Sequence, residues 1–230
     1  MRAPTLARPL PGDLRSELFS AGSVPVESIS TADDCERIRE FIDEFDDRNS
    51  EINYAGTEKR IWQAHRHLPE IAAVKSRADA LISRIFETTI ASRDVLAIRN
   101  LPVDQTPDLQ RGRWHLDSLR RQVKVFLFLS DVGEGNGPLE IVPRSQAPLT
   151  KARHALAGHS VRPTDFLGTS RKYQQLDDAW VDGIVNGAGG SRALECRAGD
   201  AFVVDTSAIH RARPCVEGRR YALTVYYDHF

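Results

Sequence analysis

The feature that most constrains the fold is a change of hydrophobic period near residue 93. Before it, apolar residues recur at helical spacing in two segments, 33–45 and 69–89, with charged residues on the other face. After it come short runs rich in β-branched and aromatic residues, separated by glycines. Helices followed by short strands predict an α+β chain whose core is an antiparallel sandwich or barrel. The predicted strands are Val95–Ile98, Gln122–Leu129, Leu139–Val142, Ala201–Val204 and Tyr221–Tyr227.

The first residues of the chain give weaker signals. Residues 1–22 have no clear period, and we expect an irregular lead-in. The segment Val24–Ile29 predicts an edge strand, because Pro25 has no backbone N–H to donate and fits the edge of a sheet better than its centre. Asp33 followed by Glu36 has the character of a capping box, so the first helix is expected to open there.

One long stretch, 147–191, interrupts the predicted strands. We expect a short helix at Tyr173–Val181 within it. The rest is interpreted either as a lid or binding loop or as a solvated surface excursion. Because the chain has no repeat and no low-complexity linker, we expect a single domain over 1–230. Its helical part would cover about 1–92 and its core about 93–230.

Composition excludes several classes of protein. Hydrophobic residues make up 41% and charged residues 27% of the chain, as in ordinary globular proteins. A net charge of -1 gives no electrostatic case for binding nucleic acid. No apolar run approaches the roughly 20 residues that cross a bilayer, so we expect no membrane association. Three cysteines without a C-x-x-C pair predict reduced thiols and a cytoplasmic location, and nothing indicates a protein partner.

The strongest chemical signal is the motif Trp114-His115-Leu116-Asp117. On an extended segment residues i and i+2 point to the same side, so the side chains of His115 and Asp117 should converge. An imidazole nitrogen and a carboxylate oxygen suit Fe(II), and a third ligand would complete a facial triad with open positions. An isolated H-x-D is more often a surface or turn pair. His210 is the candidate third ligand, because it follows a glycine turn and an apolar strand.

Four segments together resemble the phytanoyl-CoA dioxygenase-like family of Fe(II)/2-oxoglutarate oxygenases. The resemblance covers roughly residues 95–146 and 195–228, and the N-terminal helices fit it only loosely. It implies a double-stranded β-helix, a cupin-like jelly roll, with the N-terminal helices packed on the outside. It also implies that His115, Asp117 and His210 hold the iron. The segments are Trp114–Asp117, Lys124–Val132 continuing into Gly135–Pro143, Ala198–Asp205, and His210 followed ten residues later by Arg220.

The same resemblance assigns Arg220 to the far carboxylate of 2-oxoglutarate, which a planar guanidinium can grip through two parallel hydrogen bonds. Arg219 is the competitor, because adjacent strand residues face opposite sides and only one can point inward. The family pattern favours Arg220. By family position Phe126 should lie beside the cosubstrate and exclude water from it. The alternative is that Phe126 and Phe128 are ordinary core residues, which we favour for Phe128.

The chain departs from the family at one motif. The family usually ends its central motif with Pro-Gly-Ser-His, where this chain has Pro143-Arg144-Ser145-Gln146. The departure affects no iron ligand, but it puts any borrowed substrate assignment in doubt. One hypothesis is that Arg144, with Arg120 or Arg121, forms a cationic rim for an acidic or polar substrate. Solvated surface arginines are the commoner alternative.

The resemblance implies an oxygenase that uses Fe(II), 2-oxoglutarate and O2 and releases succinate and CO2. We expect it to hydroxylate an unactivated C–H bond of a small molecule such as a biosynthetic intermediate. Asp117 argues against halogenation, whereas desaturation, ring formation and epimerisation stay open. Two other classes are alternatives: a cupin-type metal enzyme that does not use 2-oxoglutarate and has no use for Arg220, and a non-catalytic jelly-roll binding module.

Overall fold

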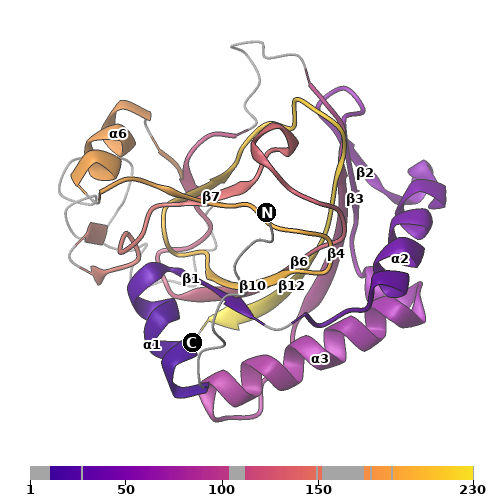
Figure 1. Ribbon diagram of the computed structural model, residues 1–230, viewed down its shortest axis with the longest axis horizontal. Coiled ribbons are helices and arrows are strands. Elements are labelled where there is room, and N and C mark those ends of the chain that lie inside the picture. Colours follow the sequence, from indigo (N-terminus) through magenta and orange to yellow (C-terminus); the bar gives the residue numbers. More distant parts are fainter. Residues whose placement is uncertain are drawn as a thin grey trace, which may run out of the picture.

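The structure is a computed structural model that describes residues 11–26, 28–103, 112–148, 150–151, 174–176, 178–187 and 189–229. Its strands form two antiparallel sheets that face each other (Figure 1). The larger sheet contains β1 (Ser23–Val26), β10 (Ala201–Asp205), β6 (Gln122–Phe128), β12 (Arg220–His229), β4 (Asp94–Asn100), β3 (Glu58–Ile61) and β2 (Glu51–Asn53), in that order. The smaller sheet contains β8 (Gln174–Gln175), β5 (His115–Leu116), β11 (His210–Ala212), β7 (Leu139–Ile141) and β9 (Arg192–Leu194), in that order.

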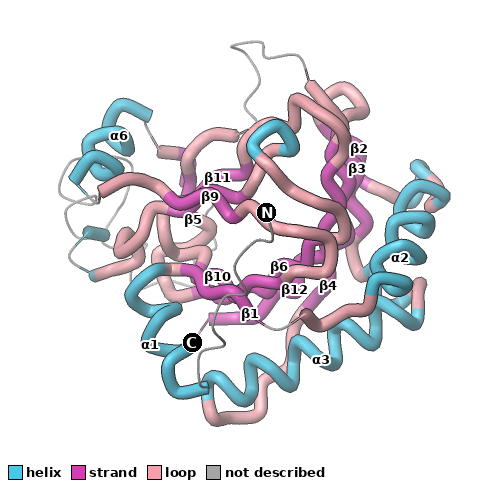
Figure 2. Tube along the Cα trace, in the orientation of Figure 1, coloured by secondary structure: helices cyan, strands magenta, loops and turns pink. Residues whose placement is uncertain are grey.

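Among the helices whose bounds the structure describes, three cover the outer face of the larger sheet and one lies beside the smaller sheet (Figure 2). The three are α1 (Pro11–Ala21), α2 (Ala32–Glu44) and α3 (Pro69–Phe86), and the fourth is α6 (Asp178–Gly187). The predicted jelly roll with its N-terminal helices outside is therefore confirmed. Short 3-10 helices occur at Asp47–Asn49, Ala64–Arg66 and Glu134–Asn136.

Side chains alternate between the two faces of β6, so the larger sheet contributes to two apolar layers. Val123, Val125 and Leu127 point to the helices and belong to the largest apolar cluster. Phe126 and Phe128 point the other way, into the space between the sheets. Because successive side chains of a strand face opposite sides, a strand buried on both faces must be apolar nearly throughout. The inner face of the larger sheet is thereby turned toward the smaller one.

The start of α2 differs from its prediction. The capping box is formed by Thr31 and Asp34, and not by Asp33 and Glu36. The Asp34 backbone N–H donates to Thr31 Oγ1 at 3.1 Å, and the Thr31 N–H donates to Asp34 Oδ2 at 3.3 Å. A short aspartate at the third helical position can close the box as a glutamate does, so both motifs fit the sequence and only the backbone decides.

The N-terminal part is also more regular than predicted. The lead-in expected to be irregular contains α1, whose Leu14 and Leu18 lie one helical turn apart and are buried. The edge strand expected at 24–29 is present as β1 at Ser23–Val26, and among the described strands it pairs with β10 alone. Strands β2 and β3 were not predicted at all. They extend the larger sheet at its other edge, so residues before 92 supply strands as well as helices.

The turn between β2 and β3 explains why this hairpin was missed. Tyr54 and Ala55 both have positive φ, at 51° and 54°, and Gly56 follows at 89°. A bulky residue rarely adopts this left-handed conformation, which Asn-Gly or Gly-rich turns normally supply. The sequence therefore lacks the usual hairpin signature.

The helix expected at Tyr173–Val181 is displaced toward the C-terminus. The structure has the short strand β8 at Gln174–Gln175 and then α6 at Asp178–Gly187. The α6 side chain of Val181 is fully buried and packs in the apolar cluster on the outer side of the smaller sheet. Residues 152–173, about half of the stretch interpreted as a lid or a surface excursion, lie outside the described residues.

Two other expectations can be compared with the structure. Within the described segments, no helix combines the length and the apolar character that crossing a membrane requires. None of the three cysteines, all of which lie in described segments, forms a disulfide.

Candidate metal centre

The two histidines of the predicted triad meet because their strands are neighbours. Strands β5 and β11 pair with His115 directly opposite His210, and the centroids of the two rings are 4.3 Å apart. Asp117 directly follows β5. Its Oδ1 lies 3.9 Å from Nε2 of His115, and its Oδ2 lies 3.5 Å from Nε2 of His210. Two atoms that each bond one ion at about 2.1 Å are at most about 4.2 Å apart, so both distances suit a shared ion.

Local hydrogen bonds orient both imidazole rings. Nδ1 of His115 lies 2.9 Å from the carbonyl oxygen of Arg113, and Nδ1 of His210 lies 2.9 Å from that of Ala208. Because a carbonyl oxygen can only accept, each Nδ1 carries a proton, and each Nε2 is the ring atom left to bind a metal. Burial and the nearby His210 also lower the pKa of His115 to about 3, which keeps this ring neutral. Both rings direct Nε2 toward Asp117, the orientation that a shared metal ion requires.

The carboxylate of Asp117 has a second partner in Lys124, whose Nζ donates to Oδ2 at 2.6 Å. Burial alone would raise the pKa of Asp117, but Lys124 and His210 outweigh burial and hold it well below its usual value. The lysine lies over the ring of Tyr226, with Nζ 4.4 Å from the centroid. The carboxylate is therefore ionised and fixed in place.

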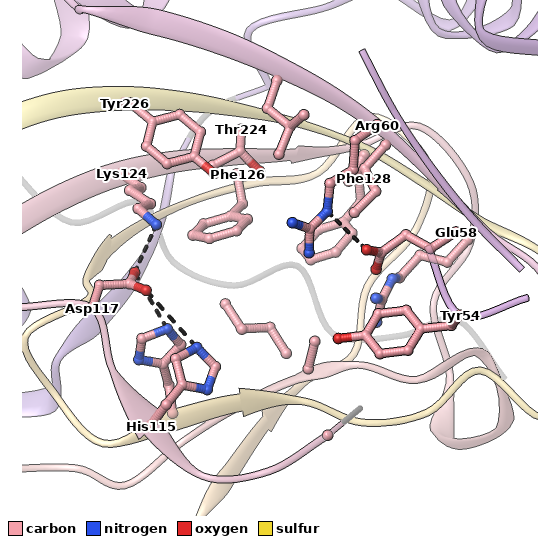
Figure 3. Close-up of a pocket in the computed structure, with 18 of the residues that line it drawn as sticks. Tyr54, Glu58, Arg60, His115, Asp117, Lys124, Phe126, Phe128, Thr224 and Tyr226 are labelled. Atoms are coloured by element: carbon pink, nitrogen blue, oxygen red, sulfur yellow. Dashed lines mark hydrogen bonds and ion pairs between the residues drawn. The ribbon is translucent and has the colours of Figure 1, made fainter. Parts of the chain in front are cut away.

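These side chains line one end of a cavity of about 290 Å³ between the two sheets (Figure 3). Its wall on the larger sheet consists of alternate residues of β6, β12, β4 and β3. Aromatic and aliphatic groups make up much of the lining: Leu96, Ile98, Phe126, Phe128, Leu139, Ala222 and Tyr226. The charged residues that line it are Glu58, Arg60, Arg113, Asp117, Lys124 and Arg220.

Arg220 faces the cavity and its competitor does not. Arg220 is 6% exposed, and its Nε and Nη2 donate to Oδ1 of Asn100 at 3.1 and 2.5 Å. The side-chain amide of Asn100 in turn donates to Glu58 Oε2 at 3.0 Å. The side chain of Arg219 is 61% exposed and lies 3.8 Å from Asp43 on the helix side of the sheet. The alternation of a strand thus selects Arg220 as the inward arginine.

The two phenylalanines of β6 both line the cavity. Phe126 is half-buried, and Phe128 is 2% exposed and also packs edge-on against Phe202, with ring centroids 6.0 Å apart. The interpretation of Phe128 as a core residue therefore holds, but the same side chain contributes to the cavity wall.

The arginines of the predicted rim lie elsewhere. Arg144 and Arg120 are exposed, and neither lines the described cavity. Arg121 donates from Nε to the buried Asp205 at 3.1 Å and stacks over Phe19, with its guanidinium carbon 3.7 Å from the ring centroid. The structure therefore does not bring these three arginines to the cavity.

Sequence reasoning missed several charged residues of the cavity. Lys124 had a detectable signal, because it alternates with Phe126 and Phe128 and so had to share their inward face. Glu58 and Arg60 had none, since their strand was not predicted. Asn100 lies two residues after the end of the predicted strand Val95–Ile98, and its role depends on the pairing of β4 with β12.

Known proteins share this arrangement of strands. Three solved structures share the fold. The epimerase SnoN in complex with Fe3+, alpha ketoglutarate and nogalamycin RO is 16% identical with a TM-score of 0.62, over 95% of this chain and 83% of SnoN. HygX from Streptomyces hygroscopicus, with nickel and 2-oxoglutarate bound, is 13% identical with a TM-score of 0.64, over 94% and 86%. The non-heme alpha ketoglutarate dependent carbocyclase SnoK from nogalamycin biosynthesis is 18% identical with a TM-score of 0.66, over 98% and 87%.

The fold and the charged cavity define a jelly roll with a His-Asp-His cluster that can hold a metal. The sequence profile of the phytanoyl-CoA dioxygenase family matches residues 19–220, and the chain belongs to that family. A search of functionally curated proteins finds no match. The protein is accordingly a non-haem iron enzyme that depends on 2-oxoglutarate and O2. A cupin-type enzyme that does not use 2-oxoglutarate and a non-catalytic binding module are both set aside.

Proposed function

We propose that His115, Asp117 and His210 hold the iron, that Arg220 binds the far carboxylate of 2-oxoglutarate, and that the enzyme hydroxylates a C–H bond of a small molecule. The observation that carries this proposal is the convergence of two Nε2 atoms and one carboxylate at one end of the cavity. His115 and Asp117 come from one short motif, and His210 lies more than 90 residues further along the chain. Chance placement of surface residues does not produce such a meeting point.

The donor set fits ferrous iron. Two neutral imidazoles and one carboxylate on the same side of an ion form the facial triad of non-haem iron oxygenases and leave positions for other ligands. When bound, the iron supplies the activation of dioxygen that is coupled to the decarboxylation of 2-oxoglutarate. The hydrogen bonds to the carbonyls of Arg113 and Ala208 hold both rings in the required tautomer.

The other residues of the cavity position and shield the reactants. The guanidinium of Arg220 is oriented by Asn100, so a carboxylate would meet a donor whose direction is already fixed. Phe126 presents an aromatic wall between this arginine and the metal ligands and limits the access of water. Hydroxylation is the outcome we propose. A cytoplasmic location and the lack of a protein partner stay predictions.

An anaerobic titration with Fe(II) and then with 2-oxoglutarate tests the metal and cosubstrate assignments. We expect a visible charge-transfer absorption that develops only when both are present. His210→Ala should abolish it, whereas His67→Ala, which changes an exposed histidine outside the cavity, should not. A wild-type protein without this absorption, or a His210→Ala variant that retains it, would contradict the proposal.

The choice between the two arginines has its own test. Arg220→Gln should raise the 2-oxoglutarate concentration at half-maximal absorption by at least about 10-fold, because a charge-assisted pair contributes about 1.5–3 kcal/mol. Arg219→Gln, on the other face of the sheet, should leave it unchanged. Once a substrate is found, mass spectrometry with isotopically labelled dioxygen should place one labelled oxygen atom in the product. Labelled succinate with an unoxygenated product would instead indicate desaturation, ring closure or epimerisation.

A further inference from the structure

A second guanidinium reaches into the cavity from the β2–β3 hairpin. Arg60 lies opposite Ile98 of β4, and its side chain is 31% exposed. Figure 3 shows it at the end of the cavity where Glu58 and Tyr54 also lie, away from His115. Nothing in the proposed handling of iron or 2-oxoglutarate uses this arginine.

The partners of Arg60 occupy only part of its hydrogen-bonding edge. Its Nε forms an ion pair with Glu58, 2.8 Å from Oε1 but not aligned as a hydrogen bond, and its Nη1 lies 3.7 Å from Oε1 of Glu51. Among the described residues, no acceptor lies within hydrogen-bonding distance of Nη2. A guanidinium has five N–H donors in a rigid fork, so it can hold one carboxylate through Nε and a second anion at its terminal nitrogens.

The charge of the cavity also admits an additional anion. The described residues that line it include four cationic side chains and two carboxylates. Fe(II) and 2-oxoglutarate carry equal and opposite charges, so loading both leaves this balance unchanged. Glu51, which lies outside the lining, offsets one cation from 3.7 Å, and solvent screens the exposed Arg113, so the lining has no net negative charge that would repel a carboxylate.

We propose that Arg60 binds a carboxylate of the primary substrate, so that the enzyme acts on small carboxylic acids. The inference rests on the proposed function, since it places the substrate between the hairpin and the metal. The carboxylate of Glu58 disfavours a dianion such as a phosphate monoester, because a second negative charge would be repelled at this distance. A singly charged carboxylate at the guanidinium of Arg60 is repelled less by Glu58.

The exposed indole of Trp62 provides a readout at the same site. Trp62 lines the cavity, is 40% exposed and lies against Tyr226, with ring centroids 5.6 Å apart. The test measures tryptophan fluorescence of the anaerobic protein loaded with Fe(II) and 2-oxoglutarate, during titration with phenylacetate, phenylacetamide or phenyl phosphate. Phenylacetate and its amide share one skeleton and differ in charge.

We expect the wild type to bind phenylacetate at least about 10-fold more tightly than phenylacetamide, and more tightly than phenyl phosphate. Arg60→Gln should bind the acid and the amide equally, whereas Arg60→Lys should retain part of the preference. Arg144→Gln, an exposed arginine away from the cavity, should behave as the wild type. Circular dichroism of each variant checks that the loss of the Glu58 pair has not unfolded the hairpin.

Three results would overturn the proposal: equal binding of acid and amide by the wild type, tighter binding of phenyl phosphate, or an unchanged preference in Arg60→Gln. A variant Arg60→Gln that loses 2-oxoglutarate binding would also overturn it, because the arginine would then serve the cosubstrate. The charge-transfer absorption separates the two proposals. Its absence in the wild type removes the proposed function, whereas its presence without an acid preference removes only the substrate class.

Discussion

Glu140 of β7 gives the structure's most quantitative prediction of stability. Its side chain is 2% exposed and accepts hydrogen bonds from Nε and Nη2 of Arg213 at 2.9 and 2.8 Å, from Nε of Arg211 at 2.7 Å and from the Ser191 hydroxyl. Burial alone would raise the pKa of Glu140, but these donors outweigh burial and lower it from 4.5 to about 2. The ionised form is therefore strongly favoured in the folded protein.

This shift sets the size and the pH dependence of the effect. Each pKa unit corresponds to about 1.4 kcal/mol, so the ionised carboxylate stabilises the fold by about 3 kcal/mol. Because the folded pKa is depressed, the contribution is complete well above pH 4.5 and is lost as the pH falls toward 2. We expect Glu140→Gln to lower the free energy of unfolding by about 3 kcal/mol at neutral pH. The difference should shrink by about 2 kcal/mol by about pH 3.

Urea denaturation of both proteins at several pH values measures this difference. The matched control is Glu134→Gln. Glu134 is 87% exposed, and its Oε1 forms a loose pair with Nη1 of Arg213 at 4.0 Å. An exposed pair of this kind contributes less than about 1 kcal/mol, so the control should unfold nearly as the wild type does. A difference for Glu140→Gln below about 1 kcal/mol at neutral pH, or one that does not change on acidification, would refute the reasoning.

Three further predictions concern the turn after β6, a helix cap and the cosubstrate site. Gly137→Ala should lower the melting temperature by several degrees, since φ is 74° there and a Cβ would clash with the carbonyl oxygen of Arg213; an unchanged melting curve would contradict this. Thr31→Ala should cost about 1 kcal/mol in urea unfolding, because it removes the acceptor that caps α2, and an effect near zero would argue against the cap. Asn100→Ala should raise the KM for 2-oxoglutarate by about 5-fold, because Arg220 loses the acceptor that orients it; a change in kcat alone would point to another role.

The strand pattern predicted much of the core and the site. Short runs of β-branched and aromatic residues located β4, β6, β7, β10 and β12. The i, i+2 rule correctly placed His115 beside Asp117. The position of His210 opposite His115 depends on which strands pair, and local sequence does not contain that information. Here it came from the family resemblance, which encodes the strand order of related folds.

The end of the cavity formed by β3 could not be predicted from the sequence, for a physical reason. The wall that bears Glu58 and Arg60 belongs to strands of three and four residues joined by a turn with left-handed Tyr54 and Ala55. Such strands are too short to show a period, and their inward residues are charged and not apolar. Sequence patterns are interpreted by the rule that inward-facing residues are apolar. Charged side chains that face the interior break this rule, and they do so most often where a ligand is bound.

The position of the β2–β3 hairpin has a consequence for the evolution and engineering of this enzyme. Among the described strands, the hairpin is the outermost unit of its sheet and pairs with the rest of the sheet through β4 alone. Strands β5 and β11, which carry both histidines, belong to the opposite sheet. Exchange or randomisation of residues 51–61 can therefore alter one end of the cavity while the opposite end keeps its shape. This segment is therefore a suitable place to engineer new substrate selectivity.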